Sequence, residues 1–207
     1  MASQYNEDEI IARLLPEATG HYMDVGCGSP ENLSNTHTLY RRGWRGLCVD
    51  PRFVFNNTLS GAWKQSRPED VVRAWAAGSS KGLVTMHVPE DHELTSIVDG
   101  WSGQKDVKVV EYVTMSLADM WREAAPREFG HSPDFLSMDI EGAEGLAIIS
   151  NQWENFRPKV LCIESLEYRS GVALFHEWEP ILLGHGYEFV EAGDGNLNRF
   201  YRLGVGN

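Results

Sequence analysis

The stretch His21–Asp50, HYMDVGCGSPENLSNTHTLYRRGWRGLCVD, decides the fold of this chain. A short apolar run ends in Asp24, and Gly26-Cys27-Gly28 then makes a turn with few side chains. The pattern of Leu33–Arg42 predicts a helix, and a second apolar run ends in Asp50. This is a strand, helix and strand with an acid at each strand end. Such a unit places a small ligand against bare backbone at the carboxyl edge of a parallel sheet.

The residues around the glycine turn indicate which nucleoside ligand it would hold. A dinucleotide-binding unit needs a third glycine where its helix begins, and the pyrophosphate binds at that helix N-terminus. This chain has Pro30 and Glu31 there instead. A carboxylate at that place repels a pyrophosphate but suits a ligand with an ammonium and a sulfonium group. The turn therefore favours S-adenosylmethionine over NAD, and Asp50, about 20 residues past the turn, is expected to bind the ribose.

Length and composition limit the class of protein. With 207 residues, of which 42% are hydrophobic, the chain is expected to form one domain, residues 1–207, with a full core. Its net charge of −12 opposes a broad nucleic-acid surface, which needs clustered Lys and Arg. The three cysteines, an odd number, favour reduced thiols in a cytoplasmic protein. No apolar stretch approaches the roughly 20 residues of a membrane span, so no membrane association is expected.

Strands and helices alternate along the rest of the chain. Residues 1–20 contain a helix at Asn6–Leu15, and Val71–Ala77 is expected to form a hairpin with Leu83–Val88. The segment 89–106 has no clear period and is predicted to be a substrate lid. Further strands are expected at Val107–Val113, Phe135–Met138 and Val160–Ile163, helices at Phe53–Gln65, Ser116–Ala125, Gly142–Ser150 and Ala173–Leu183, and a closing antiparallel hairpin at Tyr187–Val190 and Asn198–Leu203. The order predicts an α/β sandwich with a mainly parallel sheet.

A second group of acids follows the predicted strand Phe135–Met138. Asp139, Glu141 and Glu144 lie within six residues, and Glu164 ends the next predicted strand. The carboxyl ends of parallel strands meet at one edge, so these acids are expected near Asp24 and Asp50. Carboxylates in such a group repel one another unless a cation, a proton or a hydrogen-bond donor compensates them.

Two functional interpretations of this acidic group stay open. In one, Asp139 and Glu164, with Glu141 as a further ligand, hold Mg²⁺ or Ca²⁺, which orients an alcohol and lowers its pKa. In the other, Asp139 or Glu141 is a general base that takes the proton of an attacking hydroxyl. Glu141 and Glu144 would alternatively cap a helix. His37, His92 and Trp101 are weaker candidates for ligand contact.

Several motifs resemble those of the FkbM-type methyltransferases, a family within the Rossmann-like enzymes that depend on S-adenosylmethionine. Asp24–Gly28 is similar to the family's DVGAxxG turn, and residues 135–144 resemble its most diagnostic motif, DFLKIDVEGAE. Ser3–Asp8, Ser34-Asn35-Thr36 and Gly43–Leu47 with Asp50-Pro51 resemble its SQxxED, SNT and GWxG elements. Ser137 stands where the family usually has lysine, and its lack of charge favours an external cation. Cys27 and Pro30 also depart from the family pattern.

The resemblance implies a Rossmann-like three-layer sandwich and an S-adenosylmethionine-dependent O-methyltransferase. Its acceptor would be a hydroxyl of a small metabolite, such as a sugar, a glycosylated product or a polyketide. Asp24, Gly26 and Gly28 would line the methionine part of the cofactor, Asp50 would hold the ribose, and Ala77 would lie near the adenine. Two alternatives are an RNA-cap or 2′-O methyltransferase, for which Arg41, Arg42, Arg45 and Arg52 form a basic cluster, and a cofactor-binding module without catalysis. Self-association as a homo-oligomer stays open.

Overall fold

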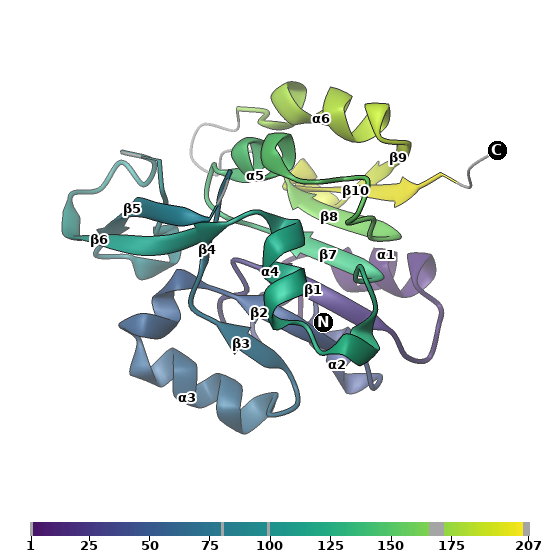
Figure 1. The fold of residues 1–207 in the computed structure, drawn as a ribbon, viewed down its shortest axis with the longest axis horizontal. Coiled ribbons are helices and arrows are strands. Elements are labelled where there is room, and N and C mark those ends of the chain that lie inside the picture. Colours follow the sequence, from purple (N-terminus) through teal and green to yellow (C-terminus); the bar gives the residue numbers. More distant parts are fainter. Residues whose placement is uncertain (1, 80, 99, 166–171, 205–207) are drawn as a thin grey trace.

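The computed structural model describes residues 2–79, 81–98, 100–165 and 172–204. Within these residues a large sheet of seven strands has the order β3-β2-β1-β7-β8-β10-β9, and a small sheet of three strands has the order β4-β6-β5 (Figure 1). Five neighbouring strands of the large sheet are parallel: β3 (Val71–Arg73), β2 (Arg45–Val49), β1 (His21–Val25), β7 (Phe135–Met138) and β8 (Val160–Glu164). The closing antiparallel hairpin is present as predicted, formed by β9 (Tyr187–Ala192) and β10 (Asn198–Leu203), and β10 also pairs with β8 in the antiparallel direction.

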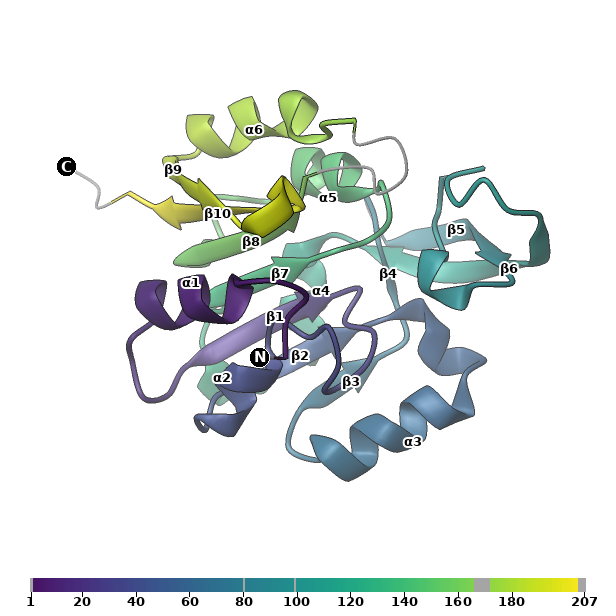
Figure 2. The same cartoon turned by 180° about the vertical axis from the view of Figure 1, so that it is seen from behind.

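Helices cover both faces of the large sheet. One face carries α4 (Leu117–Ala124), α5 (Glu144–Ser150) and α6 (Phe175–Gly184), and the other carries α1 (Glu7–Leu14), α2 (His37–Arg41) and α3 (Asn57–Ser66) (Figures 1 and 2). Side chains alternate along a strand, so in β1 Met23 packs in the first layer and Tyr22 in the second. Because both faces are covered, β7 and β8 are buried along their whole length. This three-layer arrangement confirms the predicted Rossmann-like α/β sandwich.

The predicted hairpin between Val71–Ala77 and Leu83–Val88 is wrong. Its first half is split between β3 in the large sheet and β4 (Ala76–Ala77) in the small one. β4 runs parallel to β6 (Asp106–Met115), and β5 (Gly82–Pro89) pairs with β6 in the antiparallel direction. A strand pattern indicates which face is buried but not which strand is the partner, and here the partner residues of β5 lie 17 to 32 positions further along the chain.

Two predicted helices begin later than the sequence suggested. Leu33 has a φ of +56°, in the left-handed region, so the chain turns through residues 29–36 and α2 starts only at His37. Glu141 (φ +56°) and Gly142 (φ +89°) are also left-handed, so α5 starts at Glu144. The predicted helix at Phe53–Gln65 is divided into the 3₁₀ turn η1 (Pro51–Val54) and α3.

The short elements complete the description. Three 3₁₀ turns, η2, η3 and η4, lie at His92–Leu94, Arg127–Phe129 and Asp194–Asn196. Among the described residues, no helix has the length and apolar character needed to cross a membrane.

Candidate active site

A cavity of about 460 Å³ lies at the carboxyl ends of the parallel strands, where the large sheet meets the small one. Most of the predicted site residues line it: Gly26, Gly28, Asp50, Ala77, Asp139, Glu141 and Glu164. Its size is typical of sites that enclose a small molecule. The segment between β5 and β6 adds Asp91, Leu94, Thr95 and Ile97 to the wall. The site predicted from strand ends is therefore brought together in space.

The glycine turn Gly26-Cys27-Gly28 lies between the ends of β2 and β7. Gly26 has a φ of +79°, its N–H donates to the carbonyl of Val49 (2.8 Å), and a Cβ on it would lie 1.6 Å from the carbonyl oxygen of Asp139. Any side chain at this position would collide with the backbone of the acidic loop, so only glycine fits. Gly28 is also left-handed (φ +50°), and its N–H donates to Asp50 Oδ2 (3.0 Å).

Asp50 is a satisfied carboxylate. Only 1% of the residue is exposed, and besides the Gly28 N–H it accepts hydrogen bonds from the backbone N–H of Arg52 (2.8 Å) and from its Nη2 (2.7 Å). Arg52 also lines the cavity, where it is the one basic side chain among the described lining residues. A ribose that reached Asp50 would have to displace the Arg52 guanidinium.

The structure places Asp24 behind the cavity wall, not on it. Its side chain points to the opposite face of β1 from Val25, which does line the cavity. The carboxylate accepts a hydrogen bond from the hydroxyl of Thr36 and lies near the Arg67 guanidinium. Burial raises the pKa of Asp24 to about 6, and the Thr36 hydrogen bond and the Arg67 charge oppose that rise. The predicted direct contact with the methionine part of a cofactor is thus replaced by a supporting position.

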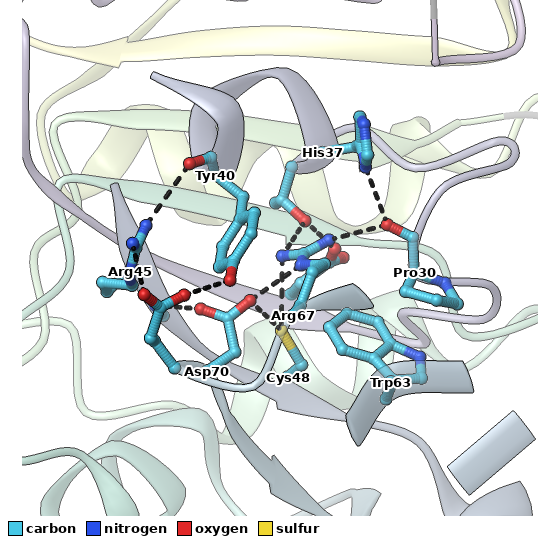
Figure 3. A network of polar contacts seen from close by, with 12 residues as sticks. Pro30, His37, Tyr40, Arg45, Cys48, Trp63, Arg67 and Asp70 are labelled. Atoms are coloured by element: carbon cyan, nitrogen blue, oxygen red, sulfur yellow. Dashed lines mark hydrogen bonds and ion pairs between the residues drawn. The ribbon is translucent and has the colours of Figure 1, made fainter. Parts of the chain in front are cut away.

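A buried arginine that the sequence did not single out connects these elements (Figure 3). Arg67 is 1% exposed and forms an ion pair with Asp70, in which Nε lies 2.7 Å from Oδ2. Its Nη2 donates to the hydroxyls of Tyr22 (2.7 Å) and Thr36 (3.0 Å). Burial lowers the pKa of this guanidinium, but its anionic and polar neighbours outweigh that effect and raise it. The only sequence signal was a charged residue before a proline, which usually indicates an exposed turn.

The predicted acids after β7 and β8 converge. One carboxylate oxygen from each of Asp139, Glu144 and Glu164 lies within 4.8 Å of the others. Glu144 reaches back to accept the N–H of Ile140 at 2.7 Å. Glu164 is 4% exposed, and its buried Oε2 receives no hydrogen bond from an N–H or hydroxyl group of the described residues.

Burial is the main reason why all the carboxyls of this group have raised pKa values. The pKa of Glu141 rises to about 7 and that of Glu144 to about 8, and the negative charge of Asp139 adds to the effect of burial in both. The pKa of Asp139 also rises through burial, although a hydrogen bond with Glu164 and the Arg52 charge oppose it. The pKa of Glu164 lies well above its ordinary value because of burial and the Asp139 charge. At neutral pH the group therefore holds protons or needs a cation.

The segment predicted to be a lid contacts the acidic loop. The indole N–H of Trp101 donates to Glu141 Oε2 (2.8 Å), and the Ser96 hydroxyl donates to the Glu141 carbonyl (2.7 Å). The Trp101 ring occupies the space in which a Cβ on Gly142 would lie, 2.4 Å from the nearest ring carbon. Trp101 itself is not part of the cavity wall. It acts on the cavity through Glu141, and a lid role for residues 89–106 stays a prediction.

The two histidines of interest lie away from the cavity wall. His37 Nδ1 is 3.1 Å from the carbonyl oxygen of Pro30, and the His92 ring packs edge-on against Phe55 with centroids 5.5 Å apart. Both contacts are structural.

Comparison with known proteins identifies the family. The model of the methyltransferase FkbM domain matches residues 24–189, which is most of the chain. The chain belongs to the FkbM methyltransferase domain family. No curated protein matches it. A solved structure with a related arrangement is the Methanococcus jannaschii fibrillarin pre-rRNA processing protein, at a TM-score of 0.48 and 9% identity, with 92% of this chain and 69% of that chain covered.

The FkbM match covers the glycine turn and every acid of the cavity, but two cavity residues lie outside it. Gln4 and Leu197 come from the N-terminal segment and from the turn before β10. The structure also places Ser137, which stands where the family usually has lysine, beside Asp24, and its hydroxyl accepts a hydrogen bond from Asn35 (3.3 Å). The Arg67 guanidinium is a positive charge near Asp24.

Proposed function

We propose that this FkbM-family methyltransferase uses S-adenosylmethionine to methylate a hydroxyl of a small metabolite, such as a sugar, a glycosylated product or a polyketide. The observation that supports this most is a single cavity in which a bare glycine turn faces carboxyls of raised pKa. A cytoplasmic location belongs to the proposal, because Cys27, Cys48 and Cys162 are buried free thiols.

The cavity has the features that the cofactor requires. Gly26, Gly28 and Ser29 offer backbone and a small side chain on the wall nearest β1, Asp50 stands at the end of β2, and Ala76 and Ala77 offer an apolar surface. We call this part of the wall the cofactor side. When bound, S-adenosylmethionine supplies a methyl group that its sulfonium already makes reactive. The task left to the protein is to align the acceptor oxygen and to remove a proton.

A second part of the wall, which we call the acceptor side, carries Asp139, Glu141 and Glu164. As the bond from oxygen to the methyl carbon forms and the bond from carbon to sulfur breaks, the hydroxyl proton must leave. Glu141 lines the cavity, and burial raises its pKa to about 7, which is near the value that suits a general base at neutral pH. Asp139 is the second candidate base. Apart from Arg52, which Asp50 binds, the described wall has no cation, so the acceptor is expected to be uncharged or positively charged.

The proposal is tested by calorimetric titration of the protein with S-adenosylhomocysteine. We expect binding by the wild type and an affinity at least about tenfold lower for Asp50→Ala. The fate of the methyl group is followed by comparing metabolites in cells with and without the protein. Absence of S-adenosylhomocysteine binding by the folded wild-type protein would contradict the proposal.

A divalent cation on the acceptor side is a second candidate feature, favoured by the unpartnered oxygen of Glu164. The oxygens of Asp139, Glu144 and Glu164 lie within 4.8 Å of one another, a limit that suits the longer Ca–O distances, whereas Mg²⁺ needs its ligand oxygens within about 4.2 Å. These residues would hold the ion, which would lower the pKa of an acceptor hydroxyl. If methyl transfer is unchanged by EDTA and by added Mg²⁺, the carboxyls act as a base and its neighbours, not as metal ligands.

An RNA methyltransferase is disfavoured by the state of the predicted basic cluster. Arg42 donates to backbone carbonyls of residues 15 and 17, Arg45 pairs with Glu69, and Arg52 pairs with Asp50. Guanidinium groups engaged in this way do not form a surface that attracts phosphates. Salt-sensitive binding of RNA by the purified protein would restore this alternative.

A further inference from the structure

Two side chains from the end of α3 hold the loop that follows the glycine turn. Trp63 is completely buried, and its indole N–H donates to the carbonyl of Gly28 at 2.8 Å. Arg67, four residues later, donates through Nη1 to the carbonyl of Pro30 (3.3 Å) and the hydroxyl of Ser34 (3.2 Å). Figure 3 shows Arg67 between Asp70 and Pro30, above Trp63. The end of one helix thus contacts the loop at its start, its middle and near its end.

The two holding residues also support each other. The Arg67 guanidinium lies over the Trp63 ring, 4.3 Å from its centroid, because residues four apart at a helix end share a face. The remaining donors of Arg67 reach Asp70 and the hydroxyls of Tyr22 and Thr36. A guanidinium that is stacked and bonded on all sides has one arrangement, so it fixes the atoms it contacts.

The loop held in this way forms part of the cofactor side. Ser29, Asn32 and Leu33 line the cavity, while neither Trp63 nor Arg67 does. Leu33 keeps a left-handed φ of +56° although it is 63% exposed, a backbone conformation that persists only when neighbouring contacts impose it. The Thr36 hydroxyl extends the support to Asp24 at the end of β1.

We propose that Trp63 and Arg67 are positioning residues for cofactor binding. They act through the Gly28 and Pro30 carbonyls and the Ser34 hydroxyl, which set the shape of residues 28–36 before any ligand arrives. This inference rests on the proposed function for the identity of the ligand. It does not rest on it for the effect on the loop, which is measurable without a ligand.

The test compares Trp63→Phe with Trp44→Phe. Trp44 is a matched control, because it is 1% exposed, packs in the same core layer as Trp63 and donates its indole N–H to a backbone carbonyl outside the site, that of Glu17 (3.2 Å). Each substitution removes one hydrogen bond of the same kind and keeps an aromatic ring. We expect similar small decreases in melting temperature for both.

The two variants should differ in their loops and in cofactor binding. Hydrogen exchange of the peptide covering residues 26–36 is expected to be several-fold faster in Trp63→Phe than in the wild type and unchanged in Trp44→Phe. The dissociation constant for S-adenosylhomocysteine should rise about tenfold in Trp63→Phe only. Arg67→Lys, which keeps the charge but loses the forked geometry, is expected to resemble Trp63→Phe.

The outcomes separate this inference from the proposed function. A wild type that does not bind S-adenosylhomocysteine contradicts the proposed function, while faster exchange confined to Trp63→Phe still supports the holding role. Unchanged loop exchange in Trp63→Phe overturns the inference. Equal losses of cofactor affinity in Trp63→Phe and Trp44→Phe also overturn it, because they indicate general destabilisation.

Discussion

Asp50 and Glu164 lie at the ends of two strands of the same sheet and line the same cavity. They are almost equally buried, at 1% and 4% exposure, but their hydrogen bonding differs. Asp50 accepts hydrogen bonds from the Gly28 backbone and from Arg52. Glu164 keeps a buried oxygen without a donor, next to two other carboxyls. Two carboxyls of similar burial in this cavity therefore differ in the number of hydrogen-bond donors that reach them.

This difference divides the cavity wall into two parts. The cofactor side, whose acids are paired with other groups of the chain, is called the completed side, and the acceptor side, whose acids keep raised pKa values, is called the uncompleted side. On the cofactor side the chain supplies its own compensating groups, from Arg52 on Asp50 to Arg67 near Asp24. On the acceptor side the N–H groups of Trp101 and Ile140 reach Glu141 and Glu144, but burial still raises the pKa values of both carboxyls. Contacts within the chain fix the conformation of the cofactor side, whereas the protonation of the acceptor side is expected to change with pH and with a bound ligand.

The largest expected effect comes from a change that breaks the completed side. Gly26→Ala places a Cβ 1.6 Å from the Asp139 carbonyl oxygen and requires a left-handed alanine. We expect a loss of at least about 3 kcal/mol in the free energy of unfolding, and no measurable binding of S-adenosylhomocysteine. Denaturant unfolding and calorimetry measure both.

Gly61→Ala is the control for that substitution. Gly61 lies in α3 with no heavy atom within 4 Å of an added Cβ, so alanine should stabilise the helix by about 1 kcal/mol. If Gly26→Ala behaves like Gly61→Ala, the close approach of the two turns is not a constraint in solution.

A smaller effect is expected on the uncompleted side, where stability should fall with rising pH. The folded-state pKa of Glu144, about 8, lies above its unfolded value of 4.5, so its contribution is complete below pH 4.5 and is lost as the pH rises through 8. Glu144→Gln keeps an oxygen that can accept the Ile140 N–H and removes the titration. We expect this variant to gain on the order of 2 kcal/mol relative to the wild type between pH 6 and pH 9.

Denaturant unfolding at several pH values measures this gain. Glu123→Gln, which alters a half-exposed surface partner of Lys81, should run parallel to the wild type throughout. Parallel curves for Glu144→Gln and the wild type would mean that the acidic group is compensated after all.

The smallest effect concerns the hydrogen bond from Trp101 to Glu141. This bond lowers the pKa of Glu141 against the rise caused by burial, so Trp101→Phe should raise that pKa above 7. The rise of methyl transfer with pH is then expected to shift upward by about one unit or less. Trp178→Phe is the control, because the Trp178 indole nitrogen has no hydrogen-bond partner among the described residues. An unshifted profile in Trp101→Phe would exclude Glu141 as the base.

The sequence was sufficient for the central parallel strands of the large sheet and for seven residues of the cavity wall. Buried parallel strands read as continuous apolar runs, so Phe135–Met138 was predicted with its observed bounds, and acids that end such runs were predicted to meet. Asp24 was expected to line the site, but the alternation of side chains in a strand turns it to the face opposite to Val25.

Two features could not be read from local patterns. The pairing of Leu83–Val88 with β6 depends on contacts across a long connection. Arg67 was missed because a charged residue beside Pro68 normally indicates solvent, and its burial requires Asp70, Tyr22 and Trp63 together. Such a network is specified by the folded arrangement, not by any short motif.

Residues 78–114, which include β5 and most of β6, begin and end at neighbouring positions. The Gly78 N–H donates to the Met115 carbonyl at 3.0 Å, and the Gly78 backbone lies against the Thr114 side chain. Residues 78–114 therefore form a cassette with adjoining ends. Exchanging this cassette between FkbM relatives would replace the wall residues Met86, Asp91, Leu94, Thr95 and Ile97 while keeping the glycine turn and its supports.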